Sequence, residues 1–123
     1  MPPPPPAPPP PPQVGTYLVP DDDFADGAVT PGTPGLRAPI AVRRVHPRYT
    51  SGAMRARIEG RVVTQIIVEA DGTVGKARVV GPLDPDLDEQ ALTAVRQWTF
   101  RPGLLDGTTV PVVVVVELEF RLH

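Results

Sequence analysis

The sequence predicts an α+β domain, in which a small three-stranded antiparallel sheet carries two helices on one face. Two segments, Arg61–Glu69 and Thr109–Leu122, alternate between apolar and other residues with the period of a β-strand. A third segment, Asp84–Gln97, has apolar residues at helical spacing. The predicted order of helix, strand, strand, helix, strand is typical of helices packed against an antiparallel sheet.

The first residues of the chain are expected to lie outside this domain. The chain has 19 prolines, and ten of them fall between Pro2 and Pro12. Because proline lacks an amide donor and has a fixed φ, this run cannot form a helix or a central strand. We therefore predict a polyproline II spacer over residues 1–12, rising about 3.1 Å per residue.

The next segment, residues 13–35, is predicted to be a disordered linker. It contains Asp21, Asp22, Asp23 and Asp26 among Gly, Pro and Thr, and it has few large apolar side chains to bury. The folded domain is expected over residues 36–123, where all 12 basic residues occur. The net charge of −2 is too mild for a nucleic-acid binder, which normally has a strong basic stripe.

The domain is predicted to begin with an extended segment, a helix and a hairpin. Ala38–Val45 is the extended approach, and Ser51–Arg57 is a short helix that Thr50 or Ser51 can cap through a hydroxyl. The strand Arg61–Glu69 is expected to have one buried and one half-exposed face. Ala70–Thr73 supplies an Asp-Gly turn, and Val74–Val80 returns as the second strand.

The second helix is predicted over Asp84–Gln97. Asp84 or Asp86 can cap its first turn, where Pro85 is also well placed. Its apolar stripe consists of Leu87, Ala91, Ala94, Val95 and Trp98. We expect Trp98 to anchor this helix to the sheet.

The final strand, Thr109–Leu122, is predicted to run along the edge of the sheet. Val112, Val114 and Val116 share one face with Leu118 and Phe120, whereas Val113 and Val115 share the other. A free strand edge can accept a peptide as an added strand, and Val113 and Val115 would offer it apolar contact. The alternative is that these two valines pack beneath a loop or simply reflect the β propensity of valine.

Several function classes have no support in the sequence. The chain contains no cysteine, no apolar run near the ~20 residues that span a bilayer, and no signal-peptide pattern after Met1. Only His46 and His123 could serve as imidazole bases, and no phosphate-binding glycine loop or metal-spaced His pair is present. Asp84, Asp86 and Asp88 suit a helix start better than a calcium loop. We therefore expect no catalytic residue, metal or cofactor.

An ordered set of motifs runs through residues 46–123. Its first half consists of Pro47–Tyr49, Arg57–Val62 and Ala70–Val74; its second half consists of Leu87-Asp88, Ala91, the run Val95–Gly103 and an apolar strand that closes on Phe120. In this order and spacing, the motifs resemble the C-terminal domain of the TonB family. TonB-like proteins also place a proline-rich spacer between a membrane helix and this domain, and a similar spacer precedes it here.

The resemblance implies a periplasmic partner-binding domain in a protein anchored to the inner membrane. Such proteins couple the proton-motive-force motor, ExbB and ExbD, to outer-membrane transporters, and the domain grips a transporter peptide called the TonB box. This chain shows no anchor helix, and we expect that an N-terminal truncation explains this. The alternative function is a non-catalytic envelope scaffold or signalling protein. Either a monomer or a strand-exchanged homodimer is compatible with the sequence.

The resemblance also indicates the residues that contact the partner. Family members often carry Gln-Pro-x-Tyr before the first helix, and the glutamine contacts the transporter peptide. Here Pro47 and Tyr49 match, and His46 replaces the glutamine; Tyr49 can instead fill the core with its hydroxyl bonded to the backbone. The predicted partner-binding residues are His46, Pro47, Tyr49, Val112, Val113, Val114, Val115, Val116 and Glu117.

Overall fold

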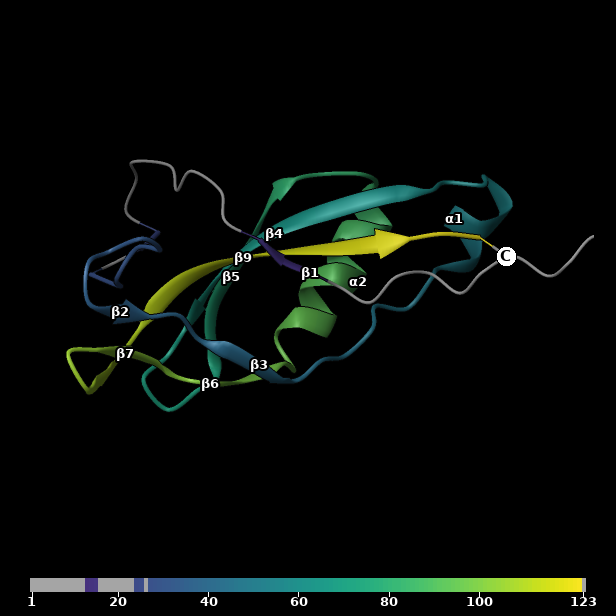
Figure 1. Ribbon diagram of the computed structural model, residues 1–123. Helices are drawn as coiled ribbons and strands as arrows, with labels where there is room; N and C mark the ends of the chain where they lie inside the picture. The colour runs from purple at the N-terminus through teal and green to yellow at the C-terminus, as the bar shows by residue number, and fades with distance from the viewer. Residues whose placement is uncertain (1–12, 16–23, 26, 123) are drawn as a thin grey trace, which may run out of the picture.

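The computed structural model describes residues 13–15, 24–25 and 27–122 and confirms the α+β class (Figure 1). The predicted spacer over residues 1–12 lies outside the described residues. The elements are β1 (Gln13–Gly15), β2 (Leu36–Arg37), β3 (Ile40–Arg43), α1 (Ser51–Arg55), β4 (Gly60–Val68), β5 (Val74–Gly81), α2 (Pro85–Val95), β6 (Thr99–Arg101), β7 (Gly103–Leu105), β8 (Thr108–Val110) and β9 (Val112–Phe120). From α1 onward, the predicted order of the main elements is confirmed.

The main sheet has the strand order β1-β9-β4-β5, and all its pairs are antiparallel. Strands β4 and β9 pair along their whole length, from Gly60 opposite Phe120 to Val68 opposite Val112. We predicted three strands; the structure adds β1, which comes from the segment predicted to be a disordered linker. Two smaller sheets, β2-β7-β8 and β3-β6, complete the described part of the fold.

The hydrophobic core lies between α2 and one face of the main sheet. Figure 1 shows α2 crossing this face and the shorter α1 beside the end at which β9 finishes. The core combines the predicted helix stripe with the even-numbered side chains of β4 and β9: Val62, Ile66, Val68, Leu87, Ala91, Ala94, Val95, Trp98, Val112, Val114, Val116, Leu118 and Phe120. Ala53 of α1 joins the same cluster.

Both helices begin with a side-chain cap, as predicted, and both are shorter than predicted. The Thr50 hydroxyl accepts a hydrogen bond from the Ala53 amide at 3.2 Å. Asp84 accepts from the amides of Asp86 and Leu87, while Asp88 accepts from the Leu83 amide at 2.9 Å. These bonds satisfy amides that a helix start leaves without an intrahelical partner.

The predicted final strand is divided at Pro111 into β8 and β9. Proline has no amide to donate to a strand ladder, so the strand pairing changes at this residue. Strands β7 and β8 form a hairpin around Asp106 and Gly107, whose φ angles of 51° and 84° are those of a primed turn.

The face of the sheet opposite α2 is more buried than we predicted. Gln65, Ile67, Val113 and Val115 have relative exposures of 1%, 4%, 0% and 2%. Phe24 lies over this face, with the Arg78 guanidinium 4.3 Å from the centre of its ring. The same Arg78 donates from Nε to Gln65 Oε1 at 2.8 Å, so the buried amide oxygen has a charged partner.

Candidate functional site

The segment carrying His46 and Pro47 is held in place by the core tryptophan. The Trp98 indole Nε1 donates a hydrogen bond to the carbonyl oxygen of Val45 at 2.9 Å. This bond holds the backbone at Val45, directly before His46. The His46 side chain is exposed, and Pro47 is half-buried. The predicted role of Trp98 as an anchor is confirmed, and the anchor also positions the candidate site.

Tyr49 joins the segment to two other elements. Its hydroxyl donates a hydrogen bond to the carbonyl oxygen of Ile58, in the loop between α1 and β4. Its ring meets the ring of Phe120 edge-on, with centroids 5.5 Å apart and planes at 89°. Burial, and secondarily the negative charge of Glu59, raises the pKa of Tyr49 above the usual tyrosine range. The structure therefore places Tyr49 in the packing role that we considered as the alternative.

A groove of about 450 Å³ lies between this segment and the end of β9. Its walls are His46, Pro47, Tyr49, Met54, Glu119, Phe120, Arg121 and Leu122. We refer to it as the His46 groove. The first three of these residues were predicted from the sequence, and the groove brings them together with the C-terminal end of β9.

Met54 is a groove residue that the sequence analysis did not identify. It is 45% exposed and also borders a second hollow beside Arg48 and Gln90. A methionine side chain is flexible and polarizable, which suits it to contact with differently shaped partners. The only sequence signal was a large apolar residue outside the apolar face of a very short helix.

One ion pair and one hydrogen bond from a backbone amide to a carboxylate order the far end of the groove. The Arg121 Nε lies 2.5 Å from Glu119 Oε1, and the Leu122 amide donates to Glu59 Oε1 at 2.7 Å. Glu59 therefore holds in place the chain that leaves β9. One wall of the groove is thus fixed by polar contacts and the other by Trp98 and Tyr49.

The predicted partner-binding residues of β9 are placed mainly inside the protein. All five valines from Val112 to Val116 are buried, and Glu117 is half-buried with its carboxylate 3.6 Å from Arg61 Nη1. Val113 and Val115 thus match the alternative in which they pack beneath the chain. What β9 can present to a partner is its backbone edge rather than these side chains.

The outer edge of β9 is occupied by the chain itself, which corrects our prediction of a free edge. Strand β1 pairs with it over Val115–Glu117, with Gln13 opposite Glu117 and Gly15 opposite Val115. Val29 bonds to the edge further back: its amide donates to the Pro111 carbonyl at 2.8 Å, and its carbonyl accepts from the Val113 amide at 2.9 Å. The physical reason is that an exposed strand edge pairs with any available extended backbone.

Across 13–15, 24–25 and 27–122, His, Asp and Glu side chains form no group of three that could hold a metal ion. The helices in this part of the chain are all too short or too polar to cross a membrane.

Comparison with known proteins agrees with this architecture. The family model described as Gram-negative bacterial TonB protein C-terminal matches residues 45–122. Protein TonB of Vibrio cholerae serotype O1 is 35% identical over 81 residues, which cover 65% of this chain and 33% of that protein. Protein TonB of Xanthomonas campestris pv. campestris is 32% identical over 78 residues, covering 63% and 35%. The chain thus spans about a third of the length of these relatives.

A solved structure supports the fold. The solution NMR structure of the Pseudomonas aeruginosa TonB CTD superposes with a TM-score of 0.53 at 21% identity, covering 76% of this chain and 93% of that one. Taken with the match over residues 45–122, these findings show that the chain belongs to the TonB family and carries its C-terminal domain.

Proposed function

We propose that this domain is a non-catalytic peptide-binding module that takes the TonB box of an outer-membrane TonB-dependent transporter as an added strand on β9. The observation that carries the proposal is the continuity between the His46 groove and the end of β9. Glu119 belongs to both, so one extended peptide could pair with the strand and continue into the groove.

The two parts of this site would contribute differently to binding. Backbone hydrogen bonds along β9 would supply affinity for any extended segment. The valine side chains of β9 are buried, so they would add little selection between peptides. Selection between peptides would then depend on the groove, where His46, Met54 and Glu119 differ in charge and shape. An imidazole can donate and accept hydrogen bonds, so His46 can take over the contact made by the family glutamine.

The role of the whole protein follows from the family and is part of the proposal. A domain of this kind would work in the periplasm, attached through the proline-rich spacer to an inner-membrane anchor. It would couple an ExbB/ExbD-type motor to active uptake through the bound transporter. The chain corresponds to about a third of its relatives' length, so the anchor and the motor contacts belong to the proposal alone.

Titration of the 123-residue chain with TonB-box peptides, followed by NMR, tests the binding proposal. Millimolar or tighter affinity is expected, with amide shifts at Val115, Glu117 and His46. A His46→Ala variant should bind at least about threefold more weakly, the equivalent of a modest lost hydrogen bond. Shifts confined to other surfaces, or no shifts across several peptides, would overturn the proposal.

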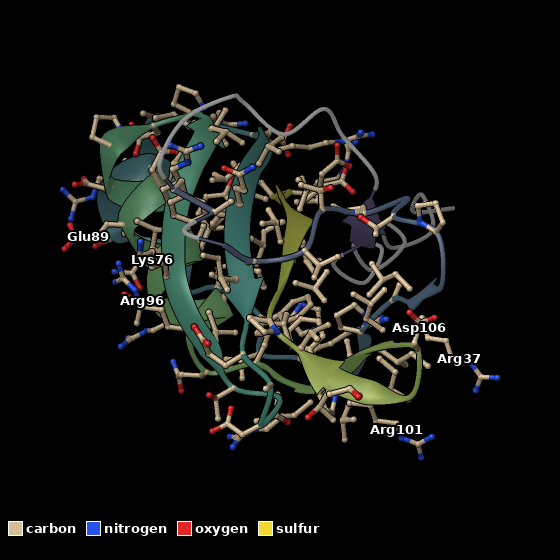
Figure 2. The ribbon with its side chains drawn as sticks, turned by 90° about the vertical axis from the view of Figure 1, so that its left-hand side faces the viewer. Arg37, Lys76, Glu89, Arg96, Arg101 and Asp106 are labelled. Atoms are coloured by element: carbon tan, nitrogen blue, oxygen red, sulfur yellow. The ribbon has the colours of Figure 1, made fainter. Side chains whose placement is uncertain are left out.

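Arg96→Ala is the matched control. Arg96 is exposed after α2, on the side of the molecule away from β1, as Figure 2 shows. Its removal should leave the affinity unchanged. If peptides fail to bind while a soluble envelope protein shifts the same β9 and groove amides, the scaffold alternative replaces the transporter proposal.

A further inference from the structure

We infer that Gln13–Gly15 and Val29 form an intramolecular cap on the outer edge of β9, which an incoming peptide must displace. The cap is the chain's own substitute for a partner strand. Its competition with a peptide rests on the proposed function, whereas its existence as a cap does not.

The cap covers most of the edge through backbone groups. Val29 bonds to Pro111 and Val113, and β1 pairs with Val115–Glu117. Figure 1 shows β1 alongside the middle of β9. An edge filled in this way offers few unpaired backbone groups between Pro111 and Glu117.

The pairing also shows which β9 residues direct their backbone outward. The Val113 amide donates to Val29 rather than to β4. Because backbone groups alternate sides along a strand, Val115 and Glu117 also point toward the outer edge, where their register partners are Gly15 and Gln13. Val114 and Val116 then point toward β4, and Val14 has its backbone groups turned away from β9.

The cap stops short of the His46 groove. The pairing of β1 ends at Glu117, and Glu119, the next residue with an outward backbone, lines the groove. A peptide can therefore bind first in the groove and at Glu119 without moving the cap. It can then extend along β9 and replace β1 residue by residue, exchanging one set of backbone hydrogen bonds for another.

This exchange would lower the apparent affinity of the site and make it selective. A closed cap reduces affinity by the fraction of molecules in which the edge is open. A peptide that can only form a strand would find the β9 edge already paired with the cap. A peptide that also fits the His46 groove could bind there first and then displace the cap. A capped edge is also protected from pairing with other chains, which is the usual hazard of an exposed strand.

The test uses proline substitutions in the full chain. Gln13→Pro combined with Gly15→Pro removes both amides that face β9, whereas Val14→Pro removes one that faces away and serves as the matched control. Amide hydrogen exchange is measured without peptide. Exchange at Val115 and Glu117 should be at least about tenfold faster in the double variant than in the control. The amides of Val114 and Val116 should stay protected in both, because β4 accepts from them.

Peptide binding is then measured on the same proteins. The double variant should bind TonB-box peptide at least about fivefold more tightly than the Val14→Pro control. Equal exchange at Val115 and Glu117 in the two variants would overturn the cap. Faster exchange with equal, measurable affinities would overturn the competition. Faster exchange with no peptide binding to any variant would overturn the proposed function and leave the cap established.

Discussion

The indole nitrogen of Trp98 and the carbonyl oxygen of Val45 are joined by a 2.9 Å hydrogen bond. Trp98 is 1% exposed and follows α2, whereas Val45 immediately precedes the exposed His46. The bond therefore fixes the backbone next to His46 relative to the core helix α2, and so positions this wall of the His46 groove. Stability and site geometry are coupled at this point.

Replacing Trp98 by Phe should test this coupling. The variant leaves the Val45 carbonyl without its donor and leaves unfilled space, so the free energy of unfolding should fall by about 2–3 kcal/mol in urea denaturation. The His46 amide resonance should also move. Leu87→Met, a volume-conserving change in the same core, should cost less than about 1.5 kcal/mol and leave His46 unshifted. An unshifted His46 amide in the tryptophan variant would contradict the coupling.

Tyr49→Phe separates the two contacts of that side chain. The ring contact with Phe120 is kept, and the hydroxyl that donates to the Ile58 carbonyl is lost. We expect unfolding free energy to fall by about 1 kcal/mol, the usual net value of such a hydrogen bond. Tyr49→Leu, which also removes the edge-on ring contact, should cost more. Equal losses for the two variants would show that the hydroxyl is the only important contact.

The raised pKa of Tyr49 predicts a loss of stability in alkali. The folded state holds this proton more tightly than the unfolded state, where the pKa is near 10.0. The stability that the protonated Tyr49 hydroxyl contributes is therefore fully present below pH 10.0. It is lost as the pH rises through the higher folded-state pKa of Tyr49. Denaturation curves at increasing pH should show this decline, and Tyr49→Phe should lack it. A parallel decline in both proteins would assign it to other groups.

Gly72 is expected to be intolerant of substitution. Its φ is +88°, and a Cβ there would lie 2.1 Å from the Phe100 carbonyl oxygen. The Phe100 amide donates to the Gly72 carbonyl at 2.8 Å, so the two backbones cannot separate without losing this bond. Gly72→Ala should therefore lower unfolding free energy by about 3 kcal/mol or more.

Gly52→Ala is the control for that substitution. Gly52 lies in α1, and a Cβ there would have no heavy atom within 4 Å. Because alanine is the better helix former, this variant should be unchanged or more stable by up to about 1 kcal/mol. Similar melting behaviour for the two alanine variants would contradict the steric argument at Gly72.

Local chemistry made much of this fold predictable. The α2 stripe, the Asp84 and Thr50 caps, the Asp-Gly turn before β5 and the alternation of β9 each depend on residues close together in sequence. The Pro47 and Tyr49 positions were also predictable, through their resemblance to a family motif. What that motif does in this chain was less clear, because Tyr49 finds its partners at Ile58 and Phe120.

The sequence by itself thus determined the helices, the hairpin, the apolar face of the sheet and the family. Only the tertiary structure decided the state of the β9 edge, the burial of Val113 and Val115, and the formation of the His46 groove. The physical reason is that periodicity reports which face of an element is apolar but not what lies across from it. Three residues such as Gln13–Gly15 carry no period of their own, and they become a strand only because β9 presents backbone groups for them to pair with.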